Sequence, residues 1–102
     1  MGQLGDKVRA LREENGLLQK DLANLLGMDT PMICKIEHGE RYAKREHITL
    51  LSQRFKVEEQ KLLSLWLSDK VYDVVKDEEV ALEALIVAES KVKQHQYSIS
   101  KK

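Results

Sequence analysis

The chain has 102 residues, 42% of them hydrophobic and 33% charged, a balance typical of a folded soluble protein of one domain or one domain with an extension. One cysteine excludes an intrachain disulfide, and no apolar run approaches the roughly 20 residues that span a bilayer. The formal net charge is zero, which argues against a strongly basic nucleic-acid-binding protein. That sum conceals a basic stretch, because five bases stand against one acid between residues 41 and 56. We predict a cytoplasmic protein with a local basic patch and no membrane segment.

Two amphipathic helices are predicted at the start of the chain. Apolar residues recur at helical spacing over 3–14 and again over about 19–26. Gly16 and Gly27 follow these two segments, and glycine commonly ends a helix because it adopts the left-handed conformation without steric cost.

A third helix is predicted over about 30–38. Asp29 precedes it as a strong N-cap residue, and Pro31 falls in the first turn, where a missing backbone N–H costs nothing. Gly39 ends this helix, and a fourth is predicted over about 45–55.

Two longer helices are predicted in the second half of the chain. Val57 leads into an acidic first turn and a dense apolar run, which predicts a fifth helix that continues through Val75. Asp77 is expected to cap a sixth helix over 78–94. The polar residues 97–102 are predicted to form a flexible tail. The pattern as a whole predicts an all-α fold with short loops.

Two short helices joined by the tight turn Gly27–Met28–Asp29 predict a helix-turn-helix motif. The segment "LLQKDLANLLGMDTPMICKIEHGERYAKREHITLLSQRFKV" resembles the phage-repressor-like Xre family of bacterial regulators, and the resemblance covers about residues 4–66. Matching positions in register are Gln19, Leu22, Ala23, Gly27, Ile33, Ile36, Glu37, Gly39 and Arg41. The following "LLSLWLSDKVYDVVKDEEVALEAL" adds a similarity to small controllers of restriction-modification or methyltransferase genes.

The resemblance implies an all-α, five-helix lambda-repressor-like domain with a C-terminal helical extension. We assign residues 1–66 to the DNA-binding domain and 67–96 to an extension that mediates dimerisation. The third helix is expected in the major groove of double-stranded DNA, where each base pair presents its own pattern of donors and acceptors.

The matched positions imply a role for individual residues. Thr30, Pro31 and Lys35 fall where the family reads bases. Phosphate or backbone contacts are implied for Gln19, His38, Arg41, Lys44 and Arg45.

Two further positions have structural implications. Arg12 and Glu37 occupy positions that form a pair in several family members, which would join the first helix to the third. Leu18 stands where the family often has a capping Ser or Thr, and Ala43 stands where a proline is frequent. These departures predict a less well capped second helix and a looser basic loop.

Simpler interpretations exist for several of these residues. Lys35 and the basic run can be ordinary solvated side chains, and Pro31 can serve only to fix the helix start. Cys34 and His38 are spaced i, i+4, but two ligands without a third do not make a metal site. The sequence also contains no recognisable catalytic motif. We therefore expect no enzyme activity, no cofactor, no metal and no small-molecule ligand.

The apolar run of the fifth helix exceeds what one small subunit usually buries. One interpretation is that the sixth helix covers it within the same subunit. The interpretation we favour is a homodimer, with the interface residues Leu63, Trp66, Leu67, Val71 and Val74.

The sequence thus predicts a dimeric, sequence-specific transcriptional regulator that binds a palindromic operator. An antitoxin with the same DNA-binding half, whose C-terminal helices neutralise a toxin, is the first alternative. A protein-interaction module that no longer binds DNA is the second, and the zero net charge favours it.

Overall fold

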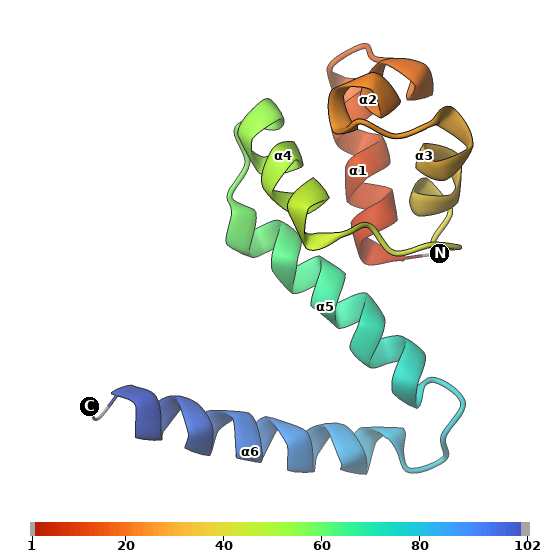
Figure 1. The fold of residues 1–102 in the computed structure, drawn as a ribbon. Coiled ribbons are helices and arrows are strands. Elements are labelled where there is room, and N and C mark those ends of the chain that lie inside the picture. Colours follow the sequence, from red (N-terminus) through yellow and green to blue (C-terminus); the bar gives the residue numbers. More distant parts are fainter. Residues whose placement is uncertain (1, 101–102) are drawn as a thin grey trace. The chain divides into compact units, whose positions relative to one another are not determined.

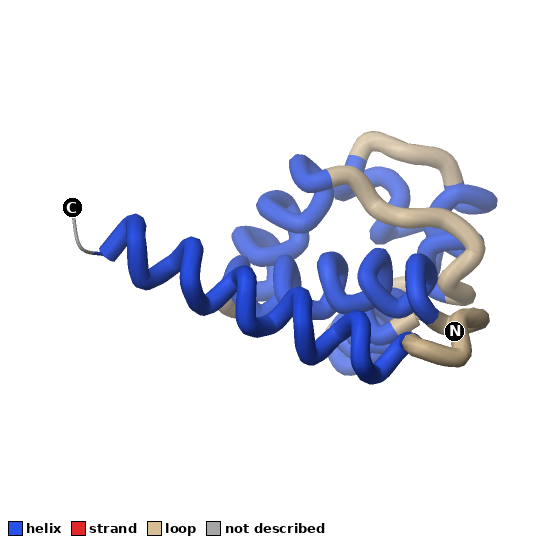
Figure 2. Tube along the Cα trace, turned by 90° about the horizontal axis from the view of Figure 1, so that it is seen from below, coloured by secondary structure: helices blue, strands red, loops and turns tan. Residues whose placement is uncertain are grey.

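The computed structural model describes residues 2–100, and within that range the chain forms six α-helices and no strand (Figures 1 and 2). The prediction of an all-α fold is confirmed, and the first four helices begin and end within one residue of their predicted bounds. The helices are α1 (Gln3–Glu14), α2 (Gln19–Leu26), α3 (Thr30–Glu37), α4 (Arg45–Phe55), α5 (Glu59–Val75) and α6 (Ala81–Ser100).

The chain divides into two compact units, which we call the N-terminal unit (Met1–Lys70) and the C-terminal unit (Val71–Lys102). The helix α5 contributes residues to both. The predicted division at residue 66 lies slightly earlier in the chain and stays a prediction.

The core of the N-terminal unit lies where α1, α2, α3, α4 and the first part of α5 meet. Full burial of one large aliphatic side chain contributes about 1.5–3 kcal/mol relative to an exposed position, so this cluster is the main source of the unit's stability. The buried cluster comprises Leu4, Val8, Leu22, Ala23, Leu26, Ile33, Ile36, Ala43, Ile48, Leu51, Leu62 and Trp66.

The helix α1 packs closely on the end of α3, and a glycine makes this possible. A Cβ atom at Gly5 would overlap the carbonyl oxygen of Ile36 and would lie 2.8 Å from that of Glu37. Real Cβ atoms do not approach backbone oxygens so closely, so any larger residue at this position would push the two helices apart. The helix that carries the predicted base contacts is therefore held directly against α1.

The start of α1 is capped by a residue that is remote in sequence. Asp69 of α5 accepts hydrogen bonds from the backbone N–H groups of Gln3 and Leu4, at 2.7 and 3.0 Å. A carboxylate at a helix N-terminus satisfies free N–H groups and interacts favourably with the helix dipole. This contact joins α5 to α1 within the N-terminal unit.

The structure corrects one of the predicted dimer-interface residues. Trp66 is only 7% exposed and belongs to the core of the N-terminal unit, because its indole fills the space beside the loop that precedes α4. Leu63 is half-buried against the same core, whereas Leu67, Val71 and Val74 are exposed. Three of the five predicted residues thus remain available to a partner.

The helix α6 differs from its prediction at both ends. It begins at Ala81 because a turn occupies residues 76–80, with the Glu78 N–H bonded to Val75 O and the Ala81 N–H to Glu78 O. Asp77 therefore lies in that turn and does not cap the helix. The helix continues through Ser100, so part of the predicted flexible tail is helical, as a segment without glycine or proline allows. Residues 101–102 of that predicted tail lie outside the described residues.

None of the described helices is long and apolar enough to cross a membrane.

Candidate nucleic-acid interface

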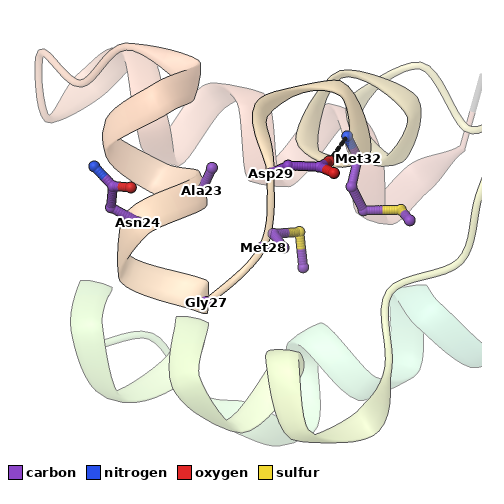
Figure 3. A pocket seen from close by; sticks show the side chains of 6 residues that line it. All are labelled: Ala23, Asn24, Gly27, Met28, Asp29 and Met32. Atoms are coloured by element: carbon purple, nitrogen blue, oxygen red, sulfur yellow. Dashed lines mark hydrogen bonds between the residues drawn. The ribbon is translucent and has the colours of Figure 1, made fainter.

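A tight turn joins α2 to α3 and fixes where α3 begins (Figure 3). Gly27 adopts the left-handed conformation with φ 69°, which reverses the chain after α2. Two residues later the side chain of Asp29 accepts a hydrogen bond from the Met32 N–H at 2.9 Å, and Pro31 occupies the first turn of α3. These local signals explain why the predicted start of α3 matches the structure.

The two faces of α3 have different surroundings. Ile33 and Ile36 are buried in the core, whereas Thr30, Pro31 and Lys35 are exposed. Pro31 and Lys35 are spaced i, i+4 and therefore project from the same side of the helix. The three predicted base-reading residues thus share an accessible surface at the beginning and middle of α3.

A buried ion pair joins the end of α3 to α1. Glu37 is 4% exposed, and its carboxylate accepts hydrogen bonds from Arg12 Nε at 2.7 Å and Arg12 Nη2 at 3.1 Å. Arg12 Nη1 also donates to the Leu17 carbonyl oxygen at 2.9 Å, which links the pair to the loop before α2. The hydrogen bonds with Glu37 raise the pKa of the Arg12 guanidinium, so Arg12 stays protonated.

The same carboxylate orients the predicted phosphate-binding glutamine. Gln19 Nε2 donates to Glu37 Oε1 at 3.2 Å, from the first residue of α2. An amide nitrogen carries two N–H donors, so one remains for a phosphate oxygen. The Leu18 side chain cannot cap α2, as predicted, but the carboxylate of Asp21 accepts the Leu18 N–H at 2.8 Å. The helix start is therefore held by Asp21 and not by a Ser or Thr before it.

Comparison with known proteins identifies this arrangement. The helix-turn-helix family model matches residues 8–62, which is more than half of the chain. The chain belongs to the Xre-like helix-turn-helix family of DNA-binding regulators. The chain is also similar to the restriction-modification controller protein C.AhdI from Aeromonas hydrophila, at 32% identity and a TM-score of 0.53, over 59% of this chain and 87% of that one. No curated protein sequence matches. The predicted family is confirmed.

The basic loop of this Xre-like domain lies between α3 and α4. Arg41, Lys44 and Arg45, the residues predicted to contact phosphates, are all exposed. Lys44 immediately precedes α4, and its backbone N–H donates to His47 Nδ1 at 3.1 Å. Burial lowers the pKa of His47, with the nearby Lys44 acting in the same direction and Glu46 opposing it. The neutral imidazole is the form that accepts this hydrogen bond, so the neutral form stabilises the start of α4.

His38 and Cys34 are adjacent at the end of α3, the second helix of the helix-turn-helix. His38 Nδ1 lies 2.7 Å from the Cys34 carbonyl oxygen, which can only accept, so Nδ1 carries a proton. The thiol sulfur lies 3.6 Å from the same nitrogen. In the described part of the chain no group of three metal-binding side chains includes this pair. A phosphate contact from His38 would have to use Nε2, and only the imidazolium form donates from that atom.

Sequence reasoning missed how the basic loop is held. Ala43 was predicted to loosen it, but Ala43 is buried and its carbonyl oxygen accepts a hydrogen bond from Trp66 Nε1 at 2.7 Å. Lys70 Nζ lies 3.6 Å from the centre of the Trp66 ring system, and Arg45 Cζ lies 5.4 Å from it. One feature of the sequence could have indicated this contact: a tryptophan in the core needs a hydrogen-bond acceptor for its indole N–H.

Proposed function

We propose that this protein is a sequence-specific transcriptional regulator that binds a palindromic operator as a homodimer. The observation that carries the proposal is the exposed surface of Thr30, Pro31 and Lys35 on a capped helix whose other face is locked into the core. An α-helix fits the major groove of B-form DNA, and a firmly held helix presents its side chains to base edges in one register.

Each of the three residues has a chemistry that suits base recognition. The Lys35 ammonium can donate to O6 and N7 of guanine, a pair of acceptors in the major groove. Thr30 can contact a thymine methyl group or form a hydrogen bond through its hydroxyl. Pro31 offers only an apolar surface, which suits a thymine methyl group.

The phosphate contacts are proposed on either side of α3. Gln19 stands at the first residue of α2, where free N–H groups attract an anion and Glu37 holds the side-chain amide. Arg41 and Lys44 supply positive charge from the loop that follows α3, and Arg45 supplies it from the first residue of α4. Such contacts provide affinity and fix the register, while the bases provide sequence preference.

The proposed dimer uses apolar side chains that the chain itself leaves exposed. Val74 is 77% exposed and Leu82 is 76% exposed. Contact of large apolar side chains with water is unfavourable, so a group of them on a surface commonly marks a protein–protein interface. Leu67 and Val71 on α5 extend this set. A two-fold dimer would present two copies of α3 to two half-sites about one helical turn apart.

The proposed target genes encode a restriction-modification system or a methyltransferase. Support comes from the similarity to a restriction-modification controller, which extends over 87% of that protein. We propose that the regulator acts in the cytoplasm and that its own concentration sets the output. An antitoxin remains the second candidate, because the exposed apolar residues of α6 would equally suit a toxin partner.

The decisive experiment selects bound DNA from a random duplex pool and then measures the affinity of the selected sequence over a range of salt concentrations. A palindromic motif with half-sites about 10 base pairs apart, and a slope of log K against log salt near −0.9 per phosphate contacted, is the expected result. Weak binding without sequence enrichment would refute the proposal and favour the protein-interaction module. A toxin gene beside the coding sequence would favour the antitoxin.

Dimerisation has its own test. Light scattering after size-exclusion chromatography should give twice the subunit mass for the wild-type protein. Val74→Lys should shift it towards the monomer, because a charge cannot be buried at an apolar interface without a partner. Leu18→Lys is the matched control, since Leu18 is also exposed but lies at the start of α2. A wild-type monomer at all concentrations would refute the dimer.

A further inference from the structure

A hydrogen bond from α5 holds the loop that carries the proposed phosphate contacts. Trp66 Nε1 donates to the carbonyl oxygen of Ala43 at 2.7 Å, and the two residues are 23 positions apart. Both are buried, so water does not compete for either group. Breaking this bond would leave a buried donor and a buried acceptor unsatisfied. The backbone between Tyr42 and Lys44 is therefore fixed at one defined point.

Two positively charged side chains lie close to the same indole ring. Lys70 Nζ lies 3.6 Å from the Trp66 ring centre, and Arg45 Cζ lies 5.4 Å from it. Lys70 Nζ also lies 5.4 Å from the Tyr42 ring centre, so one ammonium contacts an aromatic ring of α5 and another of the loop. Tryptophan is the aromatic side chain that attracts cations most strongly. The ring thus attracts the guanidinium of Arg45, which is one of the proposed phosphate-binding residues.

We propose that Trp66 is a positioning residue for DNA binding, which holds the basic loop so that Lys44 and its neighbours meet phosphate groups without first having to be ordered. The inference rests on the proposed function, and Trp66 itself touches no DNA. A flexible loop would lose conformational freedom on binding, and that loss reduces affinity. The indole N–H and the buried Ala43 methyl together provide the restraint that a proline would provide in this loop.

A double-mutant cycle tests the proposal. Trp66→Phe keeps an aromatic ring beside Lys70 and Arg45 but removes the N–H donor. We expect its affinity for the selected operator to fall about three- to tenfold, in line with the ordering cost of one or two side chains. Lys44→Ala should lower the affinity of the wild-type protein clearly, but should have less than a twofold effect in the Trp66→Phe background. The base preference should stay that of the wild-type protein, because the hydrogen bond that Trp66→Phe removes goes to Ala43 in the loop and not to α3.

A core variant separates positioning from general destabilisation. Val8→Ala removes buried volume from α1, which carries none of the proposed DNA contacts and neither partner of the hydrogen bond between Trp66 and Ala43. At a temperature far below the melting point of both variants, Val8→Ala should bind like the wild-type protein. Independent, multiplicative effects of Trp66→Phe and Lys44→Ala, or equal affinities of Trp66→Phe and Val8→Ala, would overturn the proposal. Failure of the wild-type protein to bind any duplex would instead refute the proposed function from which it starts.

A measurement on the unmodified protein covers the case in which Trp66→Phe does not fold. The chain has one tryptophan, so its indole N–H gives one proton resonance. We expect slow exchange of this proton with solvent in the free protein, because a buried hydrogen bond must open before exchange occurs. Exchange as fast as that of an exposed indole would show that the loop is not held before DNA binds, and this would overturn the proposal.

Discussion

The ion pair between Arg12 and Glu37 should be among the most sensitive points of the N-terminal unit. The Arg12 side chain is 12% exposed and that of Glu37 is 2% exposed, so water screens their interaction little. In Arg12→Met the Glu37 carboxylate would lose both guanidinium hydrogen bonds and would keep only the 3.2 Å bond from Gln19. A buried charge left without its partner costs about 3–5 kcal/mol. The bond from Arg12 to the Leu17 carbonyl would be lost as well, at about 1 kcal/mol.

Such a loss is large relative to the whole stability of a small protein. Domains of this size unfold with about 5–15 kcal/mol, and 1 kcal/mol shifts the melting temperature by about 4–8 °C. Arg12→Met should therefore lower the melting temperature by at least about 12 °C in circular dichroism. The double variant Arg12→Met, Glu37→Leu should recover most of the loss, because an apolar pair needs no desolvation of charge.

The exposed pair on the same helix provides the control. Arg9 and Glu13 approach to 3.4 Å, but their side chains are 59% and 55% exposed. Such a pair contributes at most about 0.5 kcal/mol, so Arg9→Met should leave the melting temperature nearly unchanged. If Arg12→Met cost no more than Arg9→Met, or if the double variant recovered nothing, the burial argument would be wrong.

Three further predictions concern single side chains. Lys35→Ala should cost about 1–3 kcal/mol on the selected operator and relax the preference at one base pair, whereas an equal loss on all sequences would make Lys35 a phosphate contact. The pKa of His47 lies below its ordinary value of 6.5, so the unfolded chain binds this proton more readily. Stability should therefore be complete above about pH 6.5 and should fall as the pH drops below it. His47→Gln should flatten this dependence in urea unfolding across pH. Asp69→Ala should cost about 0.5–2 kcal/mol in urea unfolding, because α1 loses its cap, while Asp77→Ala should cost almost nothing.

Local signals in the sequence were sufficient to predict the helix-turn-helix. Gly27, Asp29 and Pro31 act on their immediate neighbours through backbone conformation and capping, so their effects do not depend on the rest of the fold. The apolar spacing of Ile33 and Ile36 then fixed which side of α3 is buried. The outward direction of Lys35 follows from the same periodicity.

Contacts between remote segments could not be predicted in this way. Asp69 caps α1 from 65 or 66 residues away, and Trp66 reaches Ala43 across 23 residues. Both are polar contacts whose partners depend on how the part of α5 up to Lys70 packs on the other helices of the N-terminal unit. The tryptophan was assigned to a dimer interface because apolar spacing alone cannot distinguish a core from an interface. Its N–H, which needs a buried acceptor, was the feature that pointed to the core.

The start of α6 shows how a strong local signal can be overridden. Asp77 precedes an acidic and apolar segment, as a capping residue would. In the structure the Lys76 N–H bonds to Tyr72 O and the Glu78 N–H to Val75 O, so the residues on both sides of Asp77 still bond back to α5 and Asp77 lies in the turn between them. A cap needs extended backbone before the helix, and a chain still turning out of α5 does not provide it.

The number of base-reading residues supports the proposed dimer on energetic grounds. Specific protein–DNA complexes exceed non-specific ones by about 4–10 kcal/mol, and one good polar base contact supplies about 1–3 kcal/mol. Lys35 is the only charged side chain among the three proposed readers, and methyl contacts from Thr30 and Pro31 add less. The specificity energy that one copy of α3 can supply is therefore at or below the lower end of the range of about 4–10 kcal/mol. Two copies on one operator supply twice that energy, which lies within the range. A half-site alone should accordingly bind with little preference over random DNA.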